Sequence, residues 1–233
     1  MAVKACLNGA RTRAEHPMVP LTPSELAADA FAVRDAGAFA VHVHPRDARG
    51  AETMQARACD AAVAAIRAAV PGLPVGLSTS EAIDPDPFAR VAALRSWEQR
   101  PDFVSVNLSE LGWAGIVRAA LHAGIAVEAG LATPADAAKF ARSPFTHQVI
   151  RVLVEVHGGV DEAHAIAQLI PDSVRQLWHG YGGRTWAVIS AGAAAGLDVR
   201  VGLEDVLVLP DGRDAATNAE LVAAASELIA RLA

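Results

Sequence analysis

The sequence is short of cysteine, of aromatic residues and of positive charge. Aromatic residues make up 5% of the 233 residues, and the two cysteines are Cys6 and Cys59. Two thiols so far apart match no disulfide framework and no cysteine-based metal or redox spacing, so we assign them no chemistry. Acidic residues outnumber basic ones by 26 to 20, for a formal net charge of −6. A partner that binds through a phosphate backbone needs a basic excess, and no nucleic-acid partner is expected.

A membrane-spanning run is also missing. No stretch of about 18 uncharged apolar residues occurs without turn signals. The first six residues, Met-Ala-Val-Lys-Ala-Cys, do not form a basic region followed by an apolar run and a cleavage site. We therefore expect no membrane partner and a cytoplasmic location. The hydrophobic fraction of 52% is enough to build a large buried core.

Short apolar runs alternate along the chain with alanine-rich stretches of helical length. Eight such units, at a spacing of roughly 29 residues (233 divided by eight), are typical of repeated βα units. Thr22-Pro23 and Thr133-Pro134 each place a capping residue before a proline at the first helical position. The expected strands are 3–8, 38–45, 74–80, 103–109, 125–131, 149–157, 176–182 and 198–204. The sequence predicts one domain of the α/β class, a (β/α)₈ TIM barrel over residues 1–233.

Alternation within these strands separates a helix-facing side from an inward side. In 38–45, Val41 and Val43 face the helices while His42 and His44 face inward. The other inward polar residues are Ser105, Asn107 and Ser109 in 103–109, Glu128 in 125–131, Arg151, Glu155 and His157 in 149–157, and Arg200 and Glu204 in 198–204. Branched apolar residues normally fill a barrel interior. Polar groups near strand ends therefore predict a site at the C-terminal mouth of the barrel.

The histidine pair points to a metal. Two imidazoles at i and i+2 on one strand share a face, and neutral imidazole is a favoured zinc ligand. The alternative is a pair of hydrogen-bonded histidines near a surface. Glu204 lies at matching depth on the last strand, and two histidines with one carboxylate form a three-ligand set with an open position. We predict one divalent metal ion, zinc, bound by His42, His44 and Glu204.

Two further residues neighbour Glu204 in the sequence. Arg200 lies on the same face one step deeper, and Asp205 follows where the strand ends. An arginine and an aspartate beside a metal can act as a base with its orienting cation. An ordinary ion pair at the barrel rim is the alternative interpretation.

Polar residues that end the third and fourth strands are candidates for substrate binding. Ser78, Thr79 and Asn107 have hydroxyl and amide groups suited to a substrate carboxylate or an enolate oxygen, although capping of the next helix is equally open. Glu128 is an inward carboxylate and must be paired, metal-bound or reactive. Pairing with an inward arginine is one answer, and a role supporting the site is the one we favour.

Several motifs together resemble the β-keto acid cleavage enzymes. They are Asn8-Gly9-Ala10-Arg11, His42-Val43-His44-Pro45-Arg46-Asp47, Leu77-Ser78-Thr79, Val127-Glu128, Gly182-Gly183-Arg184, Arg200-Val201-Gly202-Leu203-Glu204-Asp205 and Thr217-Asn218-Ala219-Glu220-Leu221-Val222. The resemblance covers most of the chain. It implies a zinc-bound β-keto acid that condenses with acetyl-CoA and fragments by a retro-Claisen step to acetoacetate and a new acyl-CoA.

The resemblance also implies a role for individual residues. His42, His44 and Glu204 ligate zinc, and Asp205, steadied by Arg200, is the base that takes a proton α to the carbonyl. The implied substrate contacts are Ser78 and the residues near Asn107, and to these we add Arg11, Thr79 and Glu128 as expected substrate-binding residues. The family's habit implies a homo-oligomer, a dimer or a tetramer.

Two departures from the family pattern shape the expectations. Arg11 stands where members that cleave an amino-substituted keto acid carry a carboxylate, so we expect an acidic or neutral substrate and poor cleavage of an ammonium-bearing one. Val156-His157-Gly158-Gly159-Val160 replaces a Gly- and Pro-containing loop near the acyl-CoA. This loop motivates one alternative, a metal-binding relative without the CoA-dependent step.

A second alternative is a metal-dependent hydrolase of the amidohydrolase type. That class also uses a His-x-His pair in a barrel, and His157, His179 and Asp205 would support it. Its histidine pair normally lies on the first strand, however, where this sequence has only Cys6 and Asn8.

Overall fold

The computed structural model describes residues 1–232 and alternates eight strands with eight α-helices. The strands are β1 (Val3–Cys6), β2 (Ala38–Val43), β3 (Val75–Ser78), β4 (Phe103–Asn107), β5 (Ala126–Leu131), β6 (Arg151–Val156), β7 (Gln176–Gly180) and β8 (Asp198–Val201). The helices are α1 (Pro23–Asp35), α2 (Ala56–Ala69), α3 (Pro87–Ser96), α4 (Trp113–His122), α5 (Pro134–Ala141), α6 (Val160–Ala167), α7 (Thr185–Ala194) and α8 (Asn218–Leu232), with a short 3-10 helix η1 (Gly182–Arg184) before α7.

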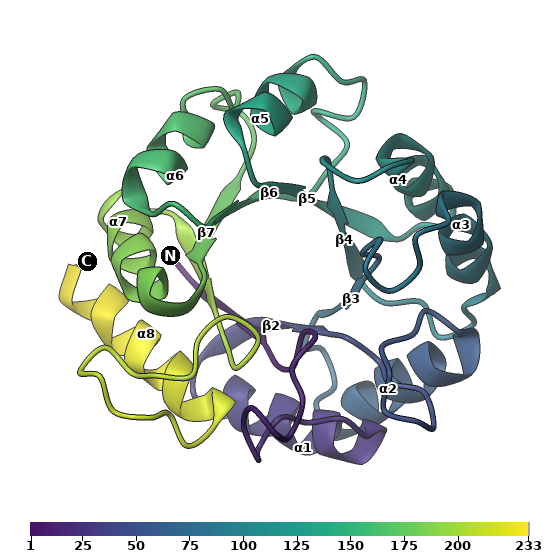
Figure 1. Cartoon of the computed structure of the whole chain (residues 1–233), viewed down its shortest axis with the longest axis horizontal. Coiled ribbons are helices and arrows are strands. Elements are labelled where there is room, and N and C mark those ends of the chain that lie inside the picture. Colours follow the sequence, from purple (N-terminus) through teal and green to yellow (C-terminus); the bar gives the residue numbers. More distant parts are fainter. Residues whose placement is uncertain (233) are drawn as a thin grey trace.

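The strands close into one parallel barrel in sequence order, as predicted. Each strand pairs with the next, and β1 pairs with β8 through Val3 opposite Val199 and Lys4 opposite Arg200. In Figure 1 the strands form a ring and the helices surround it, with α8 beside α1 and α7. None of the helices within residues 1–232 has both the length and the apolar character needed to cross a membrane.

The apolar core lies between this ring and the helices. Val41 and Val43 of β2 are fully buried there, and the outward valines of β6 join a second cluster of buried side chains. The predicted alternation is therefore confirmed on these strands. Because the outward side chains form the core, the inward side chains can be polar.

Capping residues begin the helices where the sequence predicts. At α1, the backbone N–H of Glu25 donates to Thr22 Oγ1 (3.3 Å), and the Thr22 N–H donates to the Glu25 carboxylate (2.9 Å). At α5, the Asp136 N–H donates to Thr133 Oγ1 (3.1 Å). These bonds satisfy amides that have no partner inside the helix, which sets where each helix starts.

All strands except β5, which ends at Leu131 as predicted, end earlier at the mouth than predicted. The early end of β8 changes how Glu204 reaches the site. Residues 202–205 form a turn, with the Asp205 N–H donating to Gly202 O (2.9 Å), instead of extending β8. The backbone of Gly202 passes so close to β1 that a Cβ there would lie 1.9 Å from Cys6 O. Glu204 therefore reaches the barrel interior from a turn, not by strand alternation.

The structure also corrects the prediction that Glu128 contacts the substrate. It faces inward as predicted, but it is fully buried and both its carboxylate oxygens are paired, one with Lys4 and the other with Arg151. The Lys4 and Arg151 charges outweigh the effect of burial and lower the pKa of Glu128 to about 2. This ion cluster lies near the start of β5, one inward layer below Gly130. Glu128 is thus a paired core residue, and this geometry does not favour a substrate contact.

Candidate metal centre and the barrel mouth

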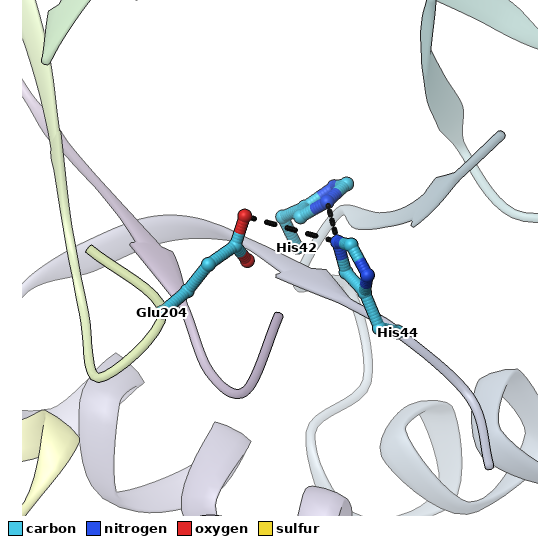
Figure 2. Close-up of side chains that lie close together, drawn as sticks. All are labelled: His42, His44 and Glu204. Atoms are coloured by element: carbon cyan, nitrogen blue, oxygen red, sulfur yellow. Dashed lines mark hydrogen bonds and ion pairs between the residues drawn. The ribbon is translucent and has the colours of Figure 1, made fainter. Parts of the chain in front are cut away.

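The three residues expected to bind metal converge at the mouth. Their possible ligand atoms all lie within 4.8 Å of one another. His42 Nε2 is 3.1 Å from His44 Nε2, and His44 Nε2 is 3.7 Å from Glu204 Oε1. Figure 2 shows the two imidazoles rising from β2 and the carboxylate approaching from the turn after β8.

Residues around His44 fix its orientation. The His44 N–H donates to Asn8 Oδ1 (2.9 Å), and Asn8 Nδ2 donates to His44 O (2.9 Å), which ties the ends of β1 and β2 together. The Glu52 carboxylate binds His44 Nδ1. A carboxylate bound to Nδ1 fixes the tautomer and the orientation of the ring, and leaves Nε2 free to bind a metal. Sequence reasoning missed Glu52, because it lies in the irregular segment after β2.

The electrostatics of the centre suit a cation. His42 is 1% exposed. Burial, reinforced by the neighbouring His44, lowers the pKa of His42 well below its usual value. The ring is therefore neutral, the form that binds metals. His42 Nδ1 and Glu204 Oε2 are buried and have no hydrogen-bond partner within residues 1–232. A buried carboxylate oxygen without a donor is costly, so these residues fit a divalent metal ion.

Arg200 links the candidate ligand Glu204 to Asp205. Its Nη2 donates to Glu204 Oε1 and, at 2.7 Å, to Asp205 Oδ1, while its Nε lies 3.2 Å and 3.1 Å from the two Asp205 oxygens. Burial alone would lower the pKa of Arg200, but Asp205, Cys6 and Glu204 raise it well above its usual value. One charged guanidinium thus orients both carboxylates. The predicted Arg200–Asp205 pair is present, and Asp205 itself is fully buried.

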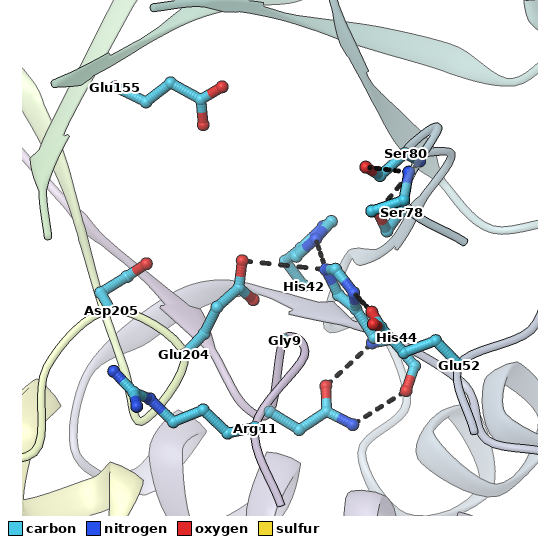
Figure 3. A network of polar contacts seen from close by, with 12 residues as sticks. Gly9, Arg11, His42, His44, Glu52, Ser78, Ser80, Glu155, Glu204 and Asp205 are labelled. Atoms are coloured by element: carbon cyan, nitrogen blue, oxygen red, sulfur yellow. Dashed lines mark hydrogen bonds and ion pairs between the residues drawn. The ribbon is translucent and has the colours of Figure 1, made fainter. Parts of the chain in front are cut away.

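The opposite wall of the mouth is lined by small polar residues (Figure 3). Ser78 faces inward, and its hydroxyl accepts the Ser80 N–H at 3.3 Å. Glu110 Oε1 accepts from both Ser80 Oγ (3.1 Å) and Asn107 Nδ2 (3.0 Å). Glu110 was not predicted; it lies in the loop after β4, where no periodicity reveals an inward residue.

Thr79 does not join this wall. Its side chain is fully buried, and Oγ1 donates to Ser105 O at 2.6 Å. Successive side chains point to opposite faces of a strand. Because Ser78 faces the mouth, its neighbour Thr79 faces away from the mouth. The expected substrate contact at Thr79 is replaced by a bond that ties the ends of β3 and β4 together.

A cavity of about 350 Å³ opens over the metal candidates. It is lined by Ala10, Arg11, Glu15, His44, Glu52, Ser80, Ala82, Tyr181 and Glu204. Arg11 is therefore at the mouth as predicted, and its Nη1 donates to Glu15 Oε1 at 3.0 Å. The cavity brings the Arg11 guanidinium, two of the candidate metal ligands, His44 and Glu204, and Tyr181 into one space.

Two further inward residues, Glu155 of β6 and His179 of β7, continue the site, because His179 Nδ1 lies 3.5 Å from Asp205 Oδ1. Glu155 and His179 are buried and face each other, with His179 Nε2 3.4 Å from Glu155 Oε2. His157 departs from the prediction, because β6 ends at Val156 and the His157 ring is exposed and stacked on Tyr181 at 4.5 Å. It does not point into the barrel, which removes one support for a hydrolase-type metal site.

Comparisons with known proteins concern the family and the fold. A family model described as beta-keto acid cleavage enzyme (BKACE) matches residues 1–157 and 147–233. The 3-keto-5-aminohexanoate cleavage enzyme of Fusobacterium nucleatum subsp. nucleatum is 24% identical over 254 aligned positions, which cover 100% of this chain and 91% of that protein.

Solved structures share the barrel. ObcA in a binary complex with oxaloacetate has a TM-score of 0.72 and 17% identity over 91% of this chain, which spans 63% of the ObcA chain. A ternary complex of ObcA with a C4-CoA adduct and oxalate gives a TM-score of 0.72 and 18% identity over 92% of this chain and 64% of that one. The 3-hexulose-6-phosphate synthase of Salmonella typhimurium, at a TM-score of 0.59, 18% identity and full coverage of both chains, is similar in fold alone. Because the family model covers the chain from end to end, the protein belongs to the beta-keto acid cleavage enzyme family.

Proposed function

We propose that this protein is a zinc-dependent enzyme that exchanges acyl groups between a β-keto acid and acetyl-CoA, giving acetoacetate and a new acyl-CoA. The observation that carries the proposal is the convergence of His42, His44 and Glu204 beside the Arg200–Asp205 pair. Family membership supplies the substrate class. The ObcA complex with a C4-CoA adduct supports a CoA thioester as co-substrate, because that protein has the same barrel.

His42, His44 and Glu204 would hold the metal. Two imidazole nitrogens and one carboxylate form a set that zinc accepts while keeping a position open. When bound, the ion supplies Lewis-acid polarisation of the keto acid, which acidifies the carbon between its two carbonyl groups. Glu52, through His44, supports this set.

Asp205 is the proposed base. It takes a proton from the carbon between the keto and carboxylate groups, and that carbon attacks the acetyl-CoA carbonyl as CoA thiolate leaves. The thiolate then attacks the original keto carbon, the bond from that carbon to the former α-carbon breaks, and the released carbanion takes the proton back. The products are one acetoacetate and one acyl-CoA, so no oxidant or water is consumed.

Arg200 positions the proposed base, Asp205, and the neighbouring candidate metal ligand, Glu204. By binding both Asp205 oxygens it limits the orientations that the carboxylate adopts, and holding a reacting group in a fixed geometry lowers the barrier to reaction. Ser78 and Asn107 on the opposite wall and Arg11 at the rim are the proposed substrate contacts. A homo-oligomeric state and a cytoplasmic location stay predictions.

The test combines metal analysis with product detection. Zinc-loaded protein is incubated with acetyl-CoA and a panel of β-keto acids, and acetoacetate and acyl-CoA are followed by mass spectrometry. We expect both products in equal amounts, about one metal per chain, and loss of metal and activity in His42→Ala.

Other results would identify the alternatives. Stoichiometric metal retained by His42→Ala would overturn the site. Release of a free acid without CoA would indicate a hydrolase. No product from any keto acid, despite bound zinc, would indicate a relative that has lost the CoA-dependent step.

A further inference from the structure

One carboxylate oxygen of Glu155 has no partner among the residues that the structure describes. Its Oε2 accepts from Tyr181 Oη and faces His179 Nε2, each at 3.4 Å. Its Oε1 has no hydrogen-bond partner within residues 1–232, and the side chain is 10% exposed. Figure 3 shows the carboxylate pointing into the mouth, across from Ser78 and Ser80. Tyr181 and His179 thus orient Glu155 through one oxygen and leave the other available.

Asn107 presents a second acceptor at the same place. Its Nδ2 donates to Glu110 Oε1 at 3.0 Å, which fixes the amide so that Oδ1 turns toward Gly130. A Cβ on Gly130 would lie 2.3 Å from Asn107 Oδ1 and 3.0 Å from Glu155 Oε1. The absence of a side chain at Gly130 therefore lets the two oxygens approach one position from β4 and β6.

Two acceptor oxygens that converge on one position cannot bond to each other and need a donor that enters between them. Burial also raises the pKa of Glu155, which reflects the cost of its charge in this wall. A ligand that brings an O–H or N–H group satisfies both oxygens at once. The other inward carboxylate of the barrel wall, Glu128, is already paired with Lys4 and Arg151 and offers no such opening.

We propose that Glu155 and Asn107 form a specificity subsite for a hydrogen-bond donor on the acyl chain of the β-keto acid, and that this donor is a hydroxyl group. The inference rests on the proposed function. The hydroxyl is favoured over an ammonium because Arg11 lines the same cavity as Tyr181, the residue that orients Glu155, and a guanidinium disfavours a cationic substrate.

The experiment compares three substrates of one length: 3-ketohexanoate, 5-hydroxy-3-ketohexanoate and 3-keto-5-aminohexanoate. With zinc-loaded enzyme and acetyl-CoA, we expect kcat/KM for the hydroxy acid to exceed that for the unsubstituted acid by at least about 10-fold, because a site built for a donor rejects the analogue that lacks it. Glu155→Leu should bring this ratio close to one. Glu155→Gln keeps an acceptor oxygen and should preserve part of the ratio.

Binding provides a readout separate from turnover. Calorimetric titration of the zinc-loaded protein with each acid should show the same preference in Kd, and Glu155→Leu should abolish it. Thermal unfolding establishes that each variant is folded. Glu98→Leu is the control, since Glu98 is exposed between α3 and β4 at the far end of the barrel, and its ratio should match the unchanged enzyme.

The outcomes separate the two proposals. Turnover without a hydroxyl preference, or a preference that survives Glu155→Leu, overturns the subsite and leaves the proposed function intact. A preference for the ammonium acid that Glu155→Gln removes overturns the choice of hydroxyl. No turnover of any acid contradicts the proposed function, and the Kd ratio then decides the subsite by itself.

Discussion

Gly9 lies against the side chain of Glu204, so close that a Cβ at position 9 would be 2.3 Å from Glu204 Cγ and 2.9 Å from Cδ. Its φ of +51° is in the left-handed region, which favours glycine. The loop after β1 therefore makes room for the carboxylate that completes the candidate metal set. The contact joins the two ends of the chain, β1 and the turn after β8, at the metal site.

Gly9→Ala should displace Glu204 and weaken metal binding. We expect a rise of about 10- to 100-fold in the zinc Kd, the range seen when the support of a metal ligand is lost, and about 1 kcal/mol of lost stability from the backbone strain. Gly124→Ala is the matched control, because Gly124, between α4 and β5, also has a positive φ (+73°) but a Cβ there would meet nothing within 4 Å in the described part of the chain. Equal zinc affinities in the two variants would contradict the role given to Gly9.

Glu52→Gln should weaken metal binding without removing a ligand. The carboxylate holds His44 Nδ1, and its loss frees the ring to rotate. Zinc titration against a competing chelator should give a Kd raised by about 10-fold or more. Glu227→Gln, on the exposed face of α8, should leave the Kd unchanged. An unchanged Kd in Glu52→Gln would show that His44 is held by other contacts.

Arg11 should set the charge of the substrates that the enzyme accepts. We expect poor turnover of 3-keto-5-aminohexanoate, because the Arg11 guanidinium lines the cavity. Arg11→Gln and Arg11→Glu should raise kcat/KM for this acid, relative to 3-ketohexanoate, in that order and by about 10-fold or more for the glutamate. Robust turnover of the amino-substituted acid by the unchanged enzyme would refute the prediction.

Lys4→Met should destabilise the barrel without altering the metal site. The substitution leaves Glu128 fully buried with Arg151 as its remaining charged partner, and breaking such a buried pair costs about 3–5 kcal/mol. Urea unfolding measures the loss, and metal analysis of the folded fraction should still give one zinc per chain. Replacing Lys4, Glu128 and Arg151 together with apolar residues should recover most of the stability. A loss of zinc in the folded Lys4→Met protein would instead return Glu128 to the site.

Asp29 should make the protein less stable as the pH rises from about 4 to 6. Burial raises the pKa of Asp29 to about 6, although Asn218 Nδ2 donates to it at 2.6 Å. The unfolded chain loses this proton near pH 4 while the folded state retains it until about pH 6, so folding is penalised progressively over that window and fully above it.

The substitution Asp29→Asn removes this penalty. Urea unfolding at pH 7.5 should show a gain of about 1–2 kcal/mol after allowance for the partial exposure of the side chain, and no gain at pH 3.5. A gain of equal size at both pH values would exclude the titration of Asp29 as its cause.

Much of the fold follows from local patterns. Alternating apolar residues in eight runs, capping residues such as Thr22 and Thr133, and the spacing of the units are enough for a (β/α)₈ barrel, because each βα unit is specified by neighbouring residues. The His42–His44 pair follows equally directly. A period of two places both imidazoles on one face whatever the rest of the chain does.

The alternation of residues along a strand predicts which face of the sheet a side chain occupies, but not its height along the barrel axis. It correctly turned Glu128 inward, yet the register between strands placed that carboxylate a layer below the mouth, where Lys4 and Arg151 occupy it. Glu204 reached the predicted position by a different route, through a turn whose shape depends on the close approach of Gly202 to β1.

The loops lie beyond what a sequence pattern determines. Glu52, Glu110 and the stacked His157–Tyr181 pair occupy segments without periodicity, and their positions depend on contacts between units far apart in the chain. The sequence alone was sufficient for the barrel and for the identity of the metal candidates. Only the tertiary structure decided which polar groups are already paired in the core and which, like Glu155 Oε1 and Asn107 Oδ1, remain available to a substrate, because pairing depends on distances that closing the barrel creates.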